Sequence, residues 1–368
     1  MGGRHYFLDS SAGLNGSRWG LKGSEDLGGG LHAVFQLENG LNLNNGALAQ
    51  NGLEFGRQAY LGLSSDRYGT VLLGRQYDKV VDYIGPLIFA DGIGTAYSAL
   101  PGDLNNTNNS TGRVNNAIKY NSPTINGLSF GALYSLGGVA GEPARNQVYS
   151  FGVGYTNGPV NAAVAFLHVN QPNSSFFSNS AIAAGSLGTA TTSATNSIYG
   201  GFANANSYQV AAAGINYAIG PAVIGLVYSN TQFQNLGSGL SSIGNGIPAG
   251  TGVGTAIFNA AEVNLTWHFT PALSVGGAYS YTAGSSVQGI NNAATGAVGT
   301  SGGSKYNEFS LAADYALSAR TDTYIAGVYQ IASGTDSTGL HAQADLNSLT
   351  PSSNNKQAIV RVGLRHKF

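Results

Sequence analysis

The chain has 368 residues, with 16 Lys and Arg, 17 Asp and Glu, and no cysteine. The formal net charge of -1 excludes a nucleic-acid binder that depends on a broad basic surface, and the missing cysteine excludes disulfide frameworks, thiolate zinc sites and cysteine nucleophiles. Residues 146–304 carry a single formal charge, Glu262, which is unusual for a soluble surface. No run of about 18 apolar residues indicates a membrane-spanning helix.

Apolar and polar residues alternate from near Ser17 to the end of the chain, and we count about fifteen strands. Small residues blur the alternation in residues 160–169 and 208–219. The pattern is strict in residues 262–269, where odd positions are apolar and even positions polar, and it recurs in residues 308–315 and 358–368. A period of two residues predicts β-strands with one apolar and one polar face.

The predicted connections alternate between short turns and long polar insertions. The short turns follow an aromatic residue, at Tyr120, Tyr155, Tyr217, Phe269 and Tyr315. The long insertions lie near residues 78–112, 171–206, 234–256, 285–304 and 334–356. A soluble β-solenoid would instead show a fixed short repeat. Long loops at one end, tight turns at the other and aromatic strand ends are typical of an antiparallel transmembrane β-barrel of the outer membrane.

If the apolar faces contact lipid, alternation places the charged strand residues inside the barrel. These residues are Arg18, Lys22, Glu38, Arg113, Lys119, Glu262, Glu308, Asp314, Arg361, Arg365 and Lys367. For Glu262, Glu308 and Asp314 we favour solvated lumen charges without a special role. Arg75 shares parity with Val71 and Leu73, and an arginine facing lipid would cost about 2 to 4 kcal/mol. Either a bulge at Gly74 turns Arg75 inward or it lies above the apolar band.

The sequence gives little support for catalysis or for a bound cofactor. The six histidines show no paired metal-ligand spacing, and no phosphate-binding glycine loop with its lysine is present. The Gly-x-Ser-x-Gly pattern at residues 299–303 lacks the strand-to-helix context of a nucleophile elbow. We therefore expect no enzyme activity, no metal and no cofactor.

Four sequence blocks resemble the general trimeric porins of Gram-negative bacteria, especially those of β-proteobacteria. They are GSRWGLKGSEDLGGGL at 16–31, LGRQYD at 73–78, GRVNNAIKYNS at 112–122 and VGLRHKF at 362–368. The resemblance covers the chain from Asn15 onward. It implies a single 16-stranded barrel domain over residues 1–368, a homotrimer among outer-membrane lipids, and passive diffusion of ions and small hydrophilic solutes. A solute-specific channel is the alternative, although we find no aromatic track; a surface adhesin or barrel-embedded enzyme is a third.

The resemblance also implies where the pore narrows. The loop at residues 79–112 would fold into the lumen, opposite a basic cluster matched by Arg18, Arg75 and Arg113. Asp91 and Asp103 are the best candidates for the pore-facing side of the loop, with loop-stabilising Asx turns as a nearly equal alternative. Lys22, Glu38, Lys119, Arg361 and Arg365 would line the lumen. We expect a weak anion preference, and the terminal Phe368 resembles the assembly signal of the family.

One departure from the family concerns the start of the chain. The first strand of the family, ahead of Asn15, has no counterpart, and residues 1–16 look like the remnant of an external loop. No basic and apolar signal-peptide segment precedes them. A barrel without its first strand would leave two unpaired edges or pair its terminal strands directly. We therefore expect roughly 10 or more further mature residues before Met1, enough for one strand, behind a cleavable signal.

Overall fold

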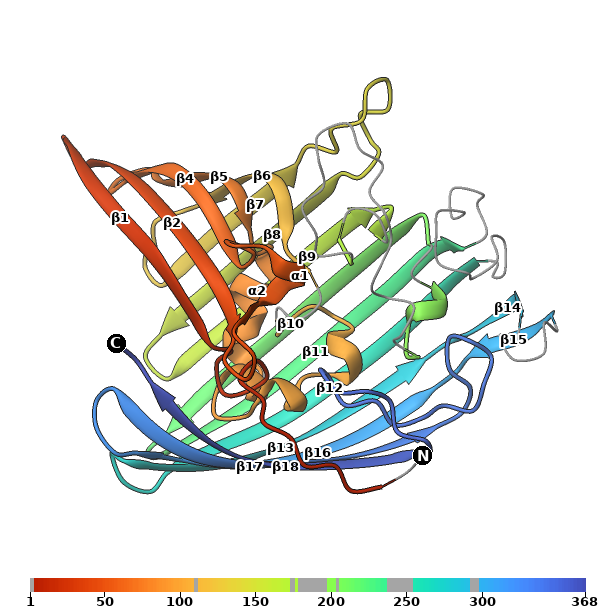
Figure 1. The fold of residues 1–368 in the computed structure, drawn as a ribbon. Coiled ribbons are helices and arrows are strands. Elements are labelled where there is room, and N and C mark those ends of the chain that lie inside the picture. Colours follow the sequence, from red (N-terminus) through yellow and green to blue (C-terminus); the bar gives the residue numbers. More distant parts are fainter. Residues whose placement is uncertain are drawn as a thin grey trace.

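The computed structural model describes residues 3–108, 112–172, 176–177, 197–202, 205–236, 254–291 and 298–368. Most of these residues belong to one antiparallel sheet of sixteen strands (Figure 1). Fifteen strands follow one another in sheet order and the short β3 pairs with β2, so the predicted number of strands is confirmed. Parts of the long insertions, including residues 109–111 of the loop at 79–112, lie outside the described residues.

The strands keep chain order in the sheet, and most consecutive strands are antiparallel neighbours. Their bounds are β1 Arg18–Gly28, β2 Leu31–Asn42, β3 Ala47–Leu48, β4 Gln58–Ser65, β5 Gly69–Gln76, β6 Val114–Asn121, β7 Leu128–Ser135, β8 Val148–Asn157, β9 Val160–Asn170, β10 Ser207–Ile219, β11 Ala222–Leu236, β12 Gly254–His268, β13 Leu273–Gly284, β16 Lys305–Ala316, β17 Thr321–Ser333 and β18 Lys356–His366. β14 Ser286–Asn291 and β15 Val298–Gly302 form a separate ribbon. Among the described strands, no ladder joins β1 to β18.

The two faces of the sheet differ as the alternation predicts. On β12, Val263 and Leu265 are 53% and 44% exposed, whereas Glu262 and Asn264 are 5% and 6% exposed. On β18 the apolar residues are exposed and the arginines between them are half-buried. An exposed apolar face over so many strands is what contact with hydrocarbon requires. Within the described chain, no helix is long and apolar enough to span a membrane.

Short and long connections alternate around the sheet. The β8–β9 and β10–β11 turns are two residues long and place Gly158 and Gly220 at φ of 55° and 54°. A positive φ at this position suits a tight hairpin and favours glycine. Long connections join the other ends of the strands around the sheet, and two of them, 43–57 and 136–147, were not among the predicted insertions.

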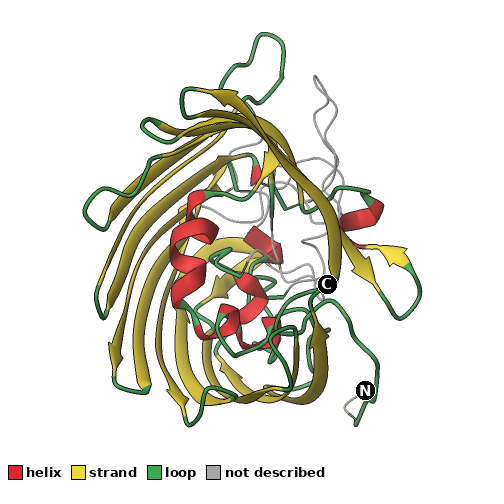
Figure 2. Cartoon of the chain, turned by 90° about the vertical axis from the view of Figure 1, so that its left-hand side faces the viewer, coloured by secondary structure: helices red, strands yellow, loops and turns green. Residues whose placement is uncertain are grey.

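The connection between β5 and β6 fills the interior of the curved sheet (Figure 2). It contains α2 Lys79–Ile84 and the 3-10 helices η1 Gly85–Leu87, η2 Phe89–Asp91, η3 Ala96–Ser98 and η4 Pro101–Asp103. Asp78 caps α2 by accepting hydrogen bonds from Val80 N at 2.7 Å and Asn106 Nδ2 at 2.7 Å. Burial raises the pKa of Asp78 to about 6. Val80, Ile84 and Leu87 pack in an apolar cluster with wall residues, and we name residues 79–112 the constriction loop.

Candidate pore constriction

Four arginines gather where β1, β4, β5 and β6 meet the long connections. Arg18 begins β1, while Arg57 and Arg113 immediately precede β4 and β6. Arg18 Nη1 lies 3.3 Å from Glu38 Oε1, and Arg57 Nε binds the same oxygen. The Arg57 and Arg113 guanidinium carbons lie 6.0 and 5.5 Å from the centre of the Tyr77 ring. This ring and one carboxylate therefore hold three of the four cations together.

Arg75 completes this group, which we name the basic cluster: Arg18, Arg57, Arg75 and Arg113. The β5–β6 ladder is irregular between residues 74 and 76, and Gly74 has a φ of 135°. Leu73 is 52% exposed on the apolar face, but Arg75 is 9% exposed. Its Nε donates to Gly56 O at 2.8 Å and its Nη1 to Asn115 Oδ1 at 2.5 Å. The irregularity at Gly74 thus breaks the alternation that would have placed Arg75 in lipid.

Sequence reasoning missed Arg57. It lies at the end of the connection 43–57, just outside β4, where alternation assigns no face to a side chain. A signal was available, because Arg57 directly precedes β4. In the neighbouring strands, Glu38 of β2 pairs with Gln58 and Arg75 of β5 pairs with Ala59, so both lie at the same level of the wall as Arg57.

The constriction loop presents one of the two predicted acids to the lumen. Asp91 is exposed, and its Oδ1 accepts a hydrogen bond from Asn108 Nδ2 at 2.6 Å. Partial desolvation and the charge of Asp103 raise the pKa of Asp91, against the lowering effect of Asn108, Arg18 and Arg57.

Asp103 does not have the predicted pore-facing position. It is 0% exposed, at a φ of 47°, and its carboxylate accepts a hydrogen bond from Asn108 N at 3.0 Å. A buried carboxylate bonded to a nearby backbone N–H shapes a loop, which was the alternative reading of this residue. It still interacts electrostatically with Arg113 across the loop boundary.

The other expected lumen charges lie on the inward face, several of them in ion pairs. Lys119 is buried, with its Nζ 2.6 Å from Asp82 Oδ2, which also pairs with Lys79 at 3.0 Å. Beside this pair lies a cavity of about 410 Å³ with polar lining residues that include Tyr60 and Asn121. It is a polar space next to the constriction loop.

Three further predicted lumen charges lie on the first and last strands, Lys22 on β1 and Arg361 and Arg365 on β18. Arg365 Nη2 lies 2.8 Å from Asp322 Oδ2, and Arg361 pairs with Asp9. Lys22 is exposed on β1. The terminal Phe368 is fully exposed, with its ring 4.8 Å from that of His366.

Glu262 and Glu308 are not the solvated lumen charges that we expected. They are 5% and 1% exposed. Glu262 Oε1 accepts hydrogen bonds from Phe89 N and Asn264 Nδ2, both at 2.8 Å, and Glu308 Oε2 accepts one from Gln330 Nε2 at 2.8 Å. The expectation was wrong because other segments cover the inward face here. The constriction loop reaches Glu262 at Phe89, and the β17–β18 connection reaches Gln330, the partner of Glu308, at Asp345.

In the described part of the chain, no group of three or more His, Asp or Glu residues is placed to hold a metal ion. The Gly-x-Ser-x-Gly pattern falls on β15, a strand of the separate ribbon, and the side chain of Ser301 lies outside the described residues.

Comparison with known proteins agrees with this geometry. A family model for Gram-negative porins matches residues 7–335. An outer membrane porin protein of Bordetella pertussis is 30% identical over 379 residues, covering 96% of this chain and 83% of that protein. Outer membrane porin protein 32 of Delftia acidovorans is 34% identical over 174 residues, covering 44% of this chain and 47% of that protein.

Solved structures share the fold. The anion-selective porin from Comamonas acidovorans superposes with a TM-score of 0.66 at 22% identity, covering 97% of this chain and 90% of that one. OmpT of Vibrio cholerae gives a TM-score of 0.59 at 15% identity, covering 97% and 89%. The chain belongs to the Gram-negative porin family, whose members are channels and not enzymes. It forms an outer-membrane β-barrel channel through which ions and small hydrophilic solutes diffuse passively.

Proposed function

We propose that the channel is a general diffusion pore with a weak anion preference, narrowed between the basic cluster and the constriction loop. The observation that supports this most is the charge balance of the basic cluster, where four guanidinium groups lie together and Arg18 and Arg57 pair with one carboxylate of the wall, Glu38, while Arg113 interacts with the buried Asp103. Asp91 opposes them from the loop and interacts with Arg18 and Arg57. The excess of positive charge favours anions, and the field across the gap orients dipolar solutes.

One structural neighbour is consistent with this sign. The porin from Comamonas acidovorans is described as anion-selective. A solute-specific channel remains the alternative function. Single-channel conductance with candidate solutes separates the two, because concentration-dependent block by one solute class would favour the specific channel.

Removing two cluster charges, by Arg18→Ala with Arg113→Ala, is expected to lower the chloride-to-potassium permeability ratio by roughly 2-fold or more, because the field is focused in a narrow, low-dielectric lumen. Reversal potentials across a planar bilayer in a KCl gradient measure this ratio. The effect should shrink in concentrated salt, since the screening length is about 8 Å at physiological ionic strength.

The matched control removes two arginines at the opposite end of the barrel, by Arg67→Ala with Arg320→Ala. Both residues are exposed in short turns, β4–β5 and β16–β17. The permeability ratio of this variant should stay near that of the unchanged protein. Cation preference in the unchanged protein, or equal shifts in the two double variants, would overturn the proposed site.

We also propose that the channel is a homotrimer, with residues 1–368 as one barrel domain. The expected external-loop placement of residues 1–16 is not kept, because Asp9 bonds to Tyr97 and Arg361, and Ala12 and Leu14 are buried. The apolar outward face is compatible with lipid and with a neighbouring subunit. Native mass spectrometry in mild detergent should give three times the chain mass of 37.6 kDa. Heat-denatured protein, measured in parallel, should give the single-chain mass. A strictly monomeric species before heating would rule out the trimer.

A further inference from the structure

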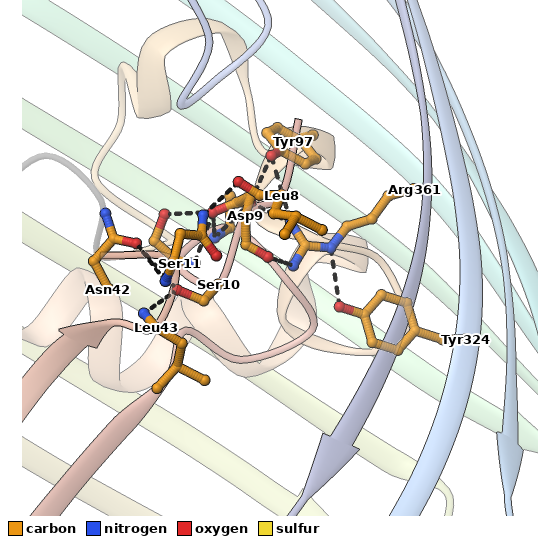
Figure 3. Close-up of polar contacts among 11 residues, drawn as sticks. Leu8, Asp9, Ser10, Ser11, Asn42, Leu43, Tyr97, Tyr324 and Arg361 are labelled. Atoms are coloured by element: carbon orange, nitrogen blue, oxygen red, sulfur yellow. Dashed lines mark hydrogen bonds and ion pairs between the residues drawn. The ribbon is translucent and has the colours of Figure 1, made fainter. Parts of the chain in front are cut away.

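The segment at residues 8–15 runs along the inside of the wall between the two ends of the sheet (Figure 3). On one side, Ser10 Oγ accepts a hydrogen bond from Leu43 N at 2.8 Å, beyond the end of β2. On the other side, Arg365 Nη1 on β18 donates to Asn15 Oδ1 at 2.6 Å. Among the described strands no ladder joins these two ends, and the segment bridges them with side-chain hydrogen bonds.

Asp9 lies at the centre of this connection. Its Oδ2 accepts a hydrogen bond from Tyr97 Oη at 2.6 Å and pairs with Arg361 Nη1. Arg361 Nη2 also donates to Asp9 O at 2.7 Å, and Arg361 Nε donates to Tyr324 Oη at 3.0 Å. Asp9 thus joins the constriction loop, through Tyr97, to the last two strands (Figure 3). We name Asp9, Tyr97, Tyr324 and Arg361 the Asp9 node.

The node is packed tightly on its apolar side. Ala12 and Tyr97 form a buried cluster with Val328 of β17 and Leu346. A Cβ atom on Gly13 would lie 2.6 Å from Tyr324 Oη and 3.2 Å from Arg361 Nη2, so the backbone passes directly over the guanidinium. The position is therefore set by packing as well as by charge.

The carboxylate of Asp9 is ionised at neutral pH. Burial alone would raise its pKa, but hydrogen bonds from Tyr97 and Ser11 and the charge of Arg361 lower the pKa to about 2. The side chains of Asp9 and Arg361 are 14% and 13% exposed, so each is shielded and neither is sealed from the pore.

We propose that Asp9 is a positioning and selectivity residue of the pore, which holds the constriction loop to the wall through Tyr97 and cancels the charge of Arg361 toward the lumen. This proposal rests on one part of the proposed function, namely that the constriction loop narrows the pore. Two separate effects follow. Loss of the Asp9 charge exposes an unpaired cation, and loss of the Tyr97 hydrogen bond frees the loop.

Two variants separate these effects. Asp9→Asn is expected to raise the chloride-to-potassium permeability ratio by roughly 1.5-fold or more and to increase open-channel current fluctuations, because an unpaired lumen cation attracts anions. Tyr97→Phe is expected to increase the fluctuations and leave the permeability ratio unchanged, since it removes a hydrogen bond and no charge. Asp9→Asn combined with Arg361→Gln should return the ratio to that of the unchanged protein.

Asp26→Asn is the matched control, since Asp26 is an exposed carboxylate on β1 beside the β1–β2 turn. Heat-resistant migration of each variant reports folding, and Tyr97→Phe tests the loop if Asp9→Asn does not fold. The proposal would be overturned if Asp9→Asn left both the permeability ratio and the current fluctuations unchanged. It would also be overturned if Asp26→Asn shifted the permeability ratio as much as Asp9→Asn does. A cation-preferring parent protein would overturn the proposed function but not this shift, which is measured from the parent value.

Discussion

Replacing Leu226 with arginine is expected to destabilise the folded barrel by about 2 to 4 kcal/mol, the cost of an arginine on the lipid face near the bilayer midplane. Leu226 lies on the outward face of β11 and is 53% exposed. Its partner in the β11–β12 ladder is Val263, which is also 53% exposed, so the substitution places a guanidinium in an apolar band.

Gln232→Arg is the control for depth. Gln232 belongs to the same strand and face, six positions further toward the long connections, or about 20 Å at the usual rise of a strand. Here arginine should cost only about 0 to 1 kcal/mol. Urea-induced unfolding in lipid vesicles measures both changes. Equal losses in the two variants, or no loss for Leu226→Arg, would contradict the assignment of this face to lipid.

The strands were predictable because lipid and pore impose opposite demands on successive residues. Over residues 262–267 of β12 and 360–365 of β18, the predicted apolar face is the exposed face of the structure and the predicted polar face is more buried. The short turns were predictable for a local reason, since glycine, proline and a preceding aromatic residue mark them. Strands and short turns depend on residues that are close together in the sequence, so the sequence pattern predicts them directly.

The constriction was only partly predictable, because a period of two residues says which face points inward and not what covers it. Glu262 and Glu308 have the predicted parity, but both are buried by segments that cross the inward face, which at Glu262 is the constriction loop. Asp103 is similar, since its burial depends on the loop fold. The family resemblance, and not the alternation, indicated which loop folds inward.

A signal for the docking of the loop was nevertheless present. The alternation was blurred on β9 and β10, and the structure gives a reason: several inward residues there are small, with Ala165 and Ala212 each 6% exposed. α2 packs against this wall. On β8, a Cβ atom at Gly152 would lie 2.4 Å from the Tyr83 ring. Small inward residues on adjacent strands thus make room for the helix.

Glu262 anchors the constriction loop to the wall beyond this region, and Glu262→Ala is expected to release that anchor. The carboxylate is buried and accepts the backbone N–H of Phe89, which lies in η2 together with Asp91. Without it, Phe89 N loses its acceptor, which costs about 1 to 3 kcal/mol for a buried donor left unsatisfied, whereas Asn264 Nδ2 loses one of two acceptors and keeps Leu87 O.

The loss should appear both as a lower urea midpoint in lipid vesicles and as larger fluctuations of the single-channel current, because η2 carries the exposed acid that faces the basic cluster. Glu262→Gln is the matched variant, since its amide oxygen still accepts the Phe89 hydrogen bond, and its current should be nearly as steady as that of the unchanged protein. If Gln and Ala at this position behave alike, charge and not the hydrogen bond holds the loop. If neither variant differs from the unchanged protein, the anchor lies elsewhere, in the apolar contacts of Phe89 with Ala312 and Ala326 on the opposite wall.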